Sequence, residues 1–152
     1  MAIRNIVQVG DEVLRKKSFA VTDFGEKTWQ LLEDMKDTLK KAQGAGLAAP
    51  QVGVLRRIFI VDLEETGLFE FINPEIISEK GSQCSVEGCL SVKGKWGDVK
   101  RPKTVTVKYQ DRYGKFHTLT ASDFFAKAIC HENDHLNGVL YIDKATNIRE
   151  EV

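Results

Sequence analysis

Two histidines four residues apart are the first feature of this chain that could support chemistry. The stretch "AICHENDHLNG" places His131 and His135 around Glu132. On a helix both imidazoles would share one face and could bind one metal ion, while the neighbouring carboxylate reaches a water molecule at that ion. A solvated surface helix is the alternative, because HExxH fixes only three of five positions. Phe124 and Ala128 lie on the ridge that leads to the histidines, which favours a partly apolar site.

A catalytic metal site of this kind usually has three protein ligands, and the third is not evident downstream. Metzincin proteases use HExxHxxGxxH, whereas "HENDHLNGVLY" has Gly138 in register but Tyr141 where the last histidine would stand. A glutamate on a following helix would have to be Glu150 or Glu151, at the chain end, where order is least expected. We therefore expect the third ligand upstream.

The upstream candidates for this ligand are Cys84, Cys89, His117 and Cys130. Cys130 lies about 100° around the helix from the first histidine and should point away from the metal-facing side. His117 falls in an alternating segment typical of a surface or cross-strand position, and Cys84 is expected to be a buried or neutral thiol. Cys89 follows Gly88 in "EGCLS", where the backbone can approach closely. From the residues alone, a ligand and a core thiol are equally good interpretations of Cys89.

Composition narrows the class of protein. The chain has 152 residues, 42% of them hydrophobic, which predicts a single domain over 1–152. Lys plus Arg and Asp plus Glu both number 22, so net charge favours neither a nucleic-acid nor a membrane partner. The start lacks a signal-peptide pattern and no run of about 18 apolar residues occurs, which predicts a cytoplasmic protein. Three cysteines argue against a disulfide framework.

Two helices are expected to position these residues. Apolar residues three and four apart predict an amphipathic helix over 26–43. The histidine helix should begin at Ser122 and Asp123, which offer an N-cap and a favourable first-turn charge. It should end before Gly138, a suitable residue just beyond the last turn.

Short strands fill most of the space between these helices. Residues 57–63 and 103–109 are rich in β-branched and aromatic residues, and 116–121 should pair back on the second of them as a hairpin. Residues 139–142 are expected to be extended. Because the strands show no regular alternation with helices, the sequence predicts an α+β fold.

Three stretches of the chain together resemble the signature motifs of the peptide deformylases. They are "GAGLAAPQ" at 44–51, "EGCLS" at 87–91 and "HENDH" at 131–135. The likeness extends through "GDEVLR", "VKRPKTVTVKYQDRYG" and "HLNGVLYID", so it covers nearly the whole chain. It implies an α+β fold with a central metal-binding helix against mostly antiparallel β-sheets.

The resemblance also implies the parts of an active site. Cys89, His131 and His135 would bind the metal, Glu132 would act as general acid and base, and Gln51 would donate a hydrogen bond to the oxyanion. The residue types suit this chemistry, because a cation held by one thiolate and two neutral imidazoles lowers the pKa of a bound water.

The remaining predicted site residues would contact the oxyanion or the substrate. The backbone N–H of Leu90 would act as a second oxyanion donor. The substrate-binding residues would be Gly44, Gly46, Glu87 and Gly88. For the glycines of "GAGLAAPQVG" there is a simpler alternative, a helix C-cap with Gly44 as its C′ residue followed by a turn.

The activity implied is removal of the N-formyl group from the initiator methionine of newly made polypeptides, with release of formate. The metal would be Fe²⁺, with Zn²⁺, Ni²⁺ and Co²⁺ as substitutes. The partners would be N-formylmethionyl peptides of nascent chains, without direct nucleic-acid or membrane binding. The alternatives are a binding module with a structural metal and a metallopeptidase that cleaves internal bonds.

Four features depart from the family pattern. Family members commonly have Gln where Cys130 stands, and Pro is frequent where Glu12 and Lys93 stand. The C-terminus is shorter than in members whose terminal helix docks on the ribosome, which argues against ribosome association. Neither proline position coincides with a predicted ligand or base.

Overall fold

The computed structural model describes residues 2–150, and Met1, Glu151 and Val152 lie outside the described residues, so the prediction for Glu151 is untested. The helices are α1 (Glu26–Ala42) and α2 (Asp123–Leu136). The strands are β1 (Gly46–Ala48), β2 (Ile58–Leu63), β3 (Gly67–Lys80), β4 (Gln83–Cys89), β5 (Val92–Arg101), β6 (Thr104–Gln110), β7 (Phe116–Ser122) and β8 (Thr146–Glu150). Short 3₁₀ helices span Glu12–Arg15, Ala49–Val52 and Tyr141–Asp143.

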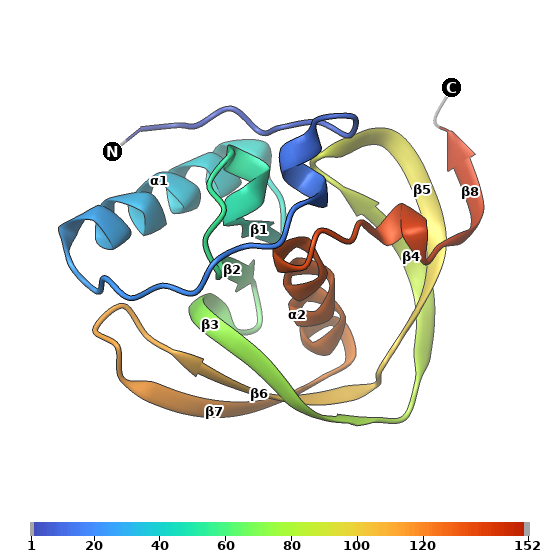
Figure 1. Ribbon diagram of the computed structural model, residues 1–152. Helices are drawn as coiled ribbons and strands as arrows, with labels where there is room; N and C mark the ends of the chain where they lie inside the picture. Colours follow the sequence, from blue (N-terminus) through green and yellow to red (C-terminus); the bar gives the residue numbers. More distant parts are fainter. Residues whose placement is uncertain (1, 151–152) are drawn as a thin grey trace.

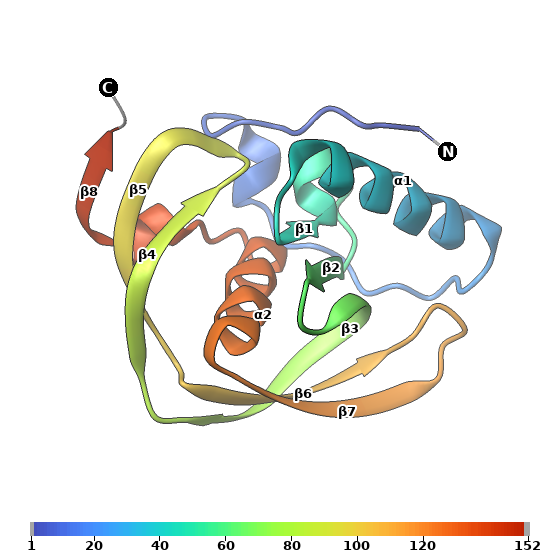
Figure 2. The same ribbon diagram turned by 180° about the vertical axis from the view of Figure 1, so that it is seen from behind.

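The strands form two antiparallel sheets with α2 between them (Figures 1 and 2). One sheet has the order β1-β2-β3-β6-β7 and the other has the order β4-β5-β8. Every strand pair within these sheets is antiparallel. The α+β class with a central helix is therefore confirmed. None of the helices within residues 2–150 is long and apolar enough to cross a membrane.

Helix α1 covers the β1–β2 end of the larger sheet. Its buried apolar face comprises Leu31, Leu32, Met35 and Leu39. The predicted end is confirmed, but the residue in the left-handed conformation is Gln43, with φ 56°, and not Gly44. Gly44 is needed for space instead, because a Cβ there would lie 2.8 Å from the Leu90 side chain.

Helix α2 begins and ends where the sequence predicts. Ser122 occupies the N-cap position, but its side chain makes no cap hydrogen bond and its hydroxyl lies 2.9 Å from that of Thr104. At the other end Gly138 has φ +74°, and a Cβ there would lie 2.5 Å from the carbonyl oxygen of Arg15. Only glycine fits this position, so the end of the histidine helix is defined by both conformation and space.

The strand predictions are confirmed in part. β2, β6 and β7 match the predicted strands, and β6 pairs with β7 as the expected hairpin. The extended segment predicted at 139–142 is wrong for its second half, because Leu140 is extended but Tyr141–Asp143 forms a 3₁₀ turn. Strands β1, β3, β4, β5 and β8 were not predicted. β3 is interrupted by register shifts around Asn73 (φ 50°), and β5 is rich in lysine and glycine, so neither shows a clean alternation.

Candidate metal centre

Three of the side chains that could bind a metal converge beside α2. Cys89 ends β4, while His131 and His135 lie on α2, and their ligand atoms are all within 4.8 Å of one another. The Cys89 Sγ is 3.4 Å from Nε2 of His135. Two other candidates lie elsewhere, because His117 pairs with Asp111 at the end of the β6–β7 hairpin and Cys84 is exposed. Of the two alternatives expected for Cys84, a buried thiol is therefore wrong.

His131 is held in place from two sides. Its Nδ1 lies 2.8 Å from a carboxylate oxygen of Glu87, which leaves Nε2 for the centre. The ring of Tyr141 stacks on the imidazole at 6.0 Å between centroids, and its hydroxyl donates to the carbonyl of Lys95 at 2.9 Å. Tyr141 stands where a metzincin would have its third histidine, and here it supports a ligand.

Glu87 belongs to a buried ion-pair network. Arg101 donates to both Glu87 oxygens at 3.0 and 2.9 Å and to Asp134 at 2.6 Å. Burial opposes the charge on Glu87, but hydrogen bonds from His131 and Arg101 outweigh it and lower the Glu87 pKa to about 2. Both carboxylate oxygens are committed to these partners, so Glu87 orients a ligand. Its predicted contact with substrate stays a prediction.

Glu132 is buried beside the predicted metal ligands, and one of its carboxylate oxygens has no hydrogen-bond partner among the described residues. Its Oε1 and the His135 Nδ1 have no hydrogen-bond partner within residues 2–150. Burial, with help from the Glu87 charge, raises the Glu132 pKa to about 7, which suits a group that both takes and gives a proton near neutral pH. Burial lowers the His135 pKa and keeps that imidazole neutral, as a metal ligand must be.

The donor set fits a divalent cation. One sulfur and two imidazole nitrogens are ligands for Fe²⁺, Zn²⁺, Co²⁺ or Ni²⁺. Burial alone would lower the pKa of His131, but Cys89 and Glu87 outweigh it and raise that pKa to about 10. The surroundings of His131 therefore favour positive charge at the place where the cation would lie.

Gln51 lies behind the ligand sulfur. Its Oε1 accepts from the Ala48 N–H at 2.9 Å, and this bond fixes the orientation of the amide. Its Nε2 donates to the Ser91 hydroxyl at 3.0 Å and lies 3.6 Å from the Cys89 Sγ. Gln51 is buried, and its amide nitrogen is shared between the Ser91 hydroxyl and the ligand sulfur.

A pocket of about 480 Å³ opens onto these groups. It is lined by the predicted site residues Gly44, Gly46, Gln51, Glu87, Gly88, Cys89, Leu90, His131 and Glu132. A Cβ on Gly46 would lie 2.7 Å from Glu132 Oε2, and one on Gly88 would lie 2.5 Å from the Trp96 ring. These two glycines therefore make room for side chains of the site itself.

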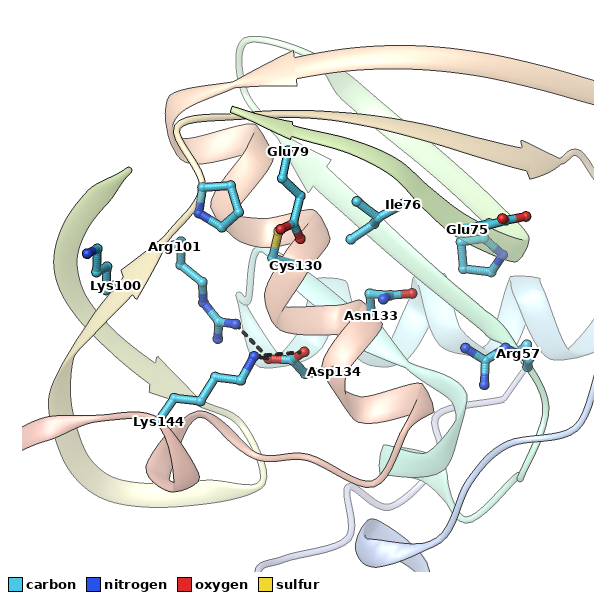
Figure 3. Close-up of a pocket in the computed structure, with 12 residues that line it drawn as sticks. Arg57, Glu75, Ile76, Glu79, Lys100, Arg101, Cys130, Asn133, Asp134 and Lys144 are labelled. Atoms are coloured by element: carbon cyan, nitrogen blue, oxygen red, sulfur yellow. Dashed lines mark hydrogen bonds and ion pairs between the residues drawn. The ribbon is translucent and has the colours of Figure 1, made fainter. Parts of the chain in front are cut away.

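Cys130 faces away from the metal centre, as predicted. It lines a second pocket of about 410 Å³ on the opposite side of α2, together with Asp134 and Arg101 (Figure 3). Burial raises the Cys130 pKa to about 12, which keeps the thiol protonated. Sequence reasoning missed Arg101, Asp134 and Tyr141, because nothing in the local pattern distinguishes them from surface charges or a core aromatic residue.

Comparisons of the sequence and of the structure with known proteins point to the same family. Residues 3–151 match the family described as polypeptide deformylase. A peptide deformylase of Thermoanaerobacter pseudethanolicus is 54% identical over 151 residues, which cover 99% of this chain and 94% of that protein. The crystal structure of a peptide deformylase from Thermotoga maritima matches with a TM-score of 0.94 at 38% identity, covering 96% of this chain and 99% of that one. The crystal structure of a peptide deformylase from Legionella pneumophila matches with a TM-score of 0.92 at 42% identity, covering 96% of this chain and 88% of that one.

Proposed function

The chain belongs to the polypeptide deformylase family, and on that premise we propose how its residues hydrolyse a formyl amide. The family removes the N-formyl group from newly made polypeptides. Cys89, His131 and His135 hold one divalent cation, which we propose is Fe²⁺, with Zn²⁺, Ni²⁺ or Co²⁺ as replacements. When bound, the cation supplies a Lewis acid and lowers the pKa of water at its open position.

Glu132 acts as the general base and then as the general acid of the reaction. It takes one from the attacking water as the carbon–oxygen bond forms and gives it to the amine as the carbon–nitrogen bond breaks. The single observation that carries this proposal is the buried Glu132 carboxyl, which lines the pocket beside the three ligands with Oε1 unpartnered among the described residues. Burial raises the Glu132 pKa, which favours return of the proton from the protonated carboxyl to the amine.

Gln51 and the backbone N–H of Leu90 stabilise the charge that develops on the former carbonyl oxygen. The Gln51 side chain is held by Ala48 and Ser91, and its Nε2 lies 3.6 Å from the Cys89 sulfur, so the donor is placed beside the metal ligands. One such preorganised donor contributes about 3 kcal/mol of transition-state stabilisation.

The substrate backbone enters between two sheet edges. β1 and β4 each end their sheet, and both contribute residues to the pocket. An extended peptide can pair with such free edges, which supports substrate contacts by Gly44, Gly46 and Gly88. We propose that the substrate is an N-formylmethionyl peptide of a nascent cytoplasmic chain, bound without direct nucleic-acid contact.

Formate release from formyl-Met peptides tests this function. Protein loaded anaerobically with Fe²⁺ or Ni²⁺ should release formate, and loss of activity in air would identify Fe²⁺. Glu132→Gln should lower kcat by about 10²- to 10⁴-fold while metal content is retained. Glu79→Gln, on the opposite side of α2, is the matched control and should keep its activity.

Other outcomes would contradict the proposal. Undiminished turnover by Glu132→Gln would overturn the proton-transfer role. Metal-loaded protein that releases no formate would indicate a structural metal, and cleavage of unformylated peptides would indicate a peptidase.

A further inference from the structure

The exposed charges at the mouth of the active-site pocket all have one sign. Five lining residues carry an acid or a lysine: Glu87, Lys93, Lys95, Lys127 and Glu132. The two carboxylates are only 3% and 5% exposed, and those of Glu87 are already bound by other groups. The three lysines, which we call the lysine rim, reach solvent.

The lysine rim comes from two different elements. Lys127 lies on α2, where its Nζ donates to the Val86 carbonyl at 3.0 Å and lies 4.9 Å from the centre of the Phe124 ring. Lys93 and Lys95 lie on β5. Cationic groups therefore approach the pocket from both the helix and the smaller sheet.

Lys93 lies four residues after Cys89, the same spacing along the chain as between Lys127 and His131. The residue before it, Val92, pairs directly with the ligand Cys89 across the β4–β5 turn. Lys93 is exposed and has no ion-pair partner within the described chain.

The mouth is also apolar. Val86, Trp96 and Phe124 are all large, exposed hydrophobic residues that line the same pocket. Low-dielectric walls weaken the screening of nearby charges and concentrate the field of the lysines at the opening. A bound carboxylate would meet this field without a competing exposed acid from the pocket lining.

We infer that the lysine rim makes this enzyme prefer formyl-Met peptides with an acidic side chain among the first residues after methionine. The inference rests on the proposed function, because it assigns a substrate class to the same pocket. An extended peptide advances about 3.3 Å per residue, so only residues close to the methionine lie at the mouth. Attraction of this kind acts mainly on binding, and so on KM more than on kcat.

The C-terminal strand supplies a weak internal competitor. Glu150 on β8 pairs with Lys95 on β5, and their side chains approach to 3.8 Å. An acidic substrate that uses Lys95 must displace this carboxylate, which is itself largely exposed. Glu150→Gln should therefore increase the acidic preference slightly, whereas loss of a rim lysine should reduce it.

Matched peptides test the preference. Formyl-Met tetrapeptides with Glu or Gln at position two, three or four are compared by kcat/KM for the metal-loaded full chain. We expect at least one Glu peptide to exceed its Gln partner by about three- to tenfold at low salt, mostly through KM. The difference should shrink at about 0.5 M salt, because exposed charges are then screened over a few ångströms.

Variants that change the charge of one lysine test whether the lysine rim causes the preference for acidic peptides. Lys93→Gln should reduce the Glu/Gln ratio and Lys93→Glu should bring it to one or below. Lys27→Glu makes the same charge change on exposed α1, outside the pocket lining, and should leave the ratio as in the wild type. Equal turnover of all Glu and Gln pairs, or equal ratios in Lys93→Glu and wild type, would overturn the inference. Formate release from the Gln peptides shows in the same assay that the proposed function itself holds.

Discussion

The two sides of helix α2 differ in how their ionisable groups are satisfied. On the side of the metal centre, Glu132 and His135 each retain a buried atom without a partner among residues 2–150. On the opposite side, Asp134 is bonded to Arg101 and to Lys144, although the neutral Asn133 amide there also keeps a buried oxygen without a partner among these residues. The ionisable residues of one helix turn thus divide into a reactive pair, Glu132 and His135, and a structural residue, Asp134.

This difference shows that the hydrogen-bond network is incomplete beside the predicted metal ligands. Unpartnered buried polar atoms are costly, and they persist at functional sites where a ligand will complete them. Arg101 connects the two sides, because it binds Asp134 on one and Glu87, the partner of His131, on the other. Changes on the structural side should therefore affect stability first, and changes on the reactive side should affect turnover first.

Removal of Arg101 should have the largest effect, because it damages both sides. Arg101→Met leaves the buried Glu87 carboxylate without its cation and should lower the unfolding free energy by about 3–5 kcal/mol. Lys144→Met removes the exposed partner of Asp134 and should cost less than about 1 kcal/mol. Denaturant unfolding of both variants measures the difference. Equal losses of unfolding free energy in the two variants would show that the buried pair of Arg101 and Glu87 contributes no more to stability than the exposed pair.

Acid should weaken the network through the same carboxylate. The Glu87 pKa is about 2 in the folded chain against an ordinary 4.5. A lowered pKa stabilises the fold at higher pH, and this contribution is lost as pH falls from 4.5 toward 2, at up to about 1.4 kcal/mol per pH unit. Denaturant unfolding of the metal-free protein at several pH values measures the slope, which should be smaller in Glu87→Gln. An unchanged slope in that variant would assign acid unfolding to other carboxylates.

A methyl group on Gly46 should affect the reactive side alone. Gly46→Ala places a Cβ against Glu132 Oε2, and the carboxylate can move away at little cost to the fold. We expect kcat to fall by about 10- to 100-fold, since small misplacement of a reacting group has effects of this size. Metal content and unfolding midpoint should stay near wild type. A variant that unfolds instead would show that Gly46 serves packing and not the position of Glu132.

Cys130 should give the smallest effect. Its thiol faces away from the centre and is protonated, so Cys130→Ala removes only a buried sulfur. We expect a loss of about 1 kcal/mol in unfolding free energy, with formate release and metal content within twofold of wild type. Loss of metal from this variant would contradict the separation of the two sides of α2.

Local sequence accounts for much of the architecture. The start and end of α2, the β6–β7 hairpin and α1 follow from caps, spacing and β-branched runs. Two of the strands missed by sequence reasoning, β3 and β5, lack a clean alternation. β3 carries register shifts, and β5 pairs on both edges despite its lysines and glycines. Pairing partners, and not their own residues, hold these segments extended.

The sequence by itself determined that two imidazoles and a carboxylate share one helical turn, because helix periodicity is local. It also made Cys89 a candidate, and the family resemblance made it the preferred one. Only the tertiary structure brought Cys89 within reach of His135, buried Glu132 beside Gly46, and enclosed Glu87 between His131 and Arg101. Burial and long-range contacts change the charge state of a side chain, and they depend on residues tens of positions away, which local spacing does not specify.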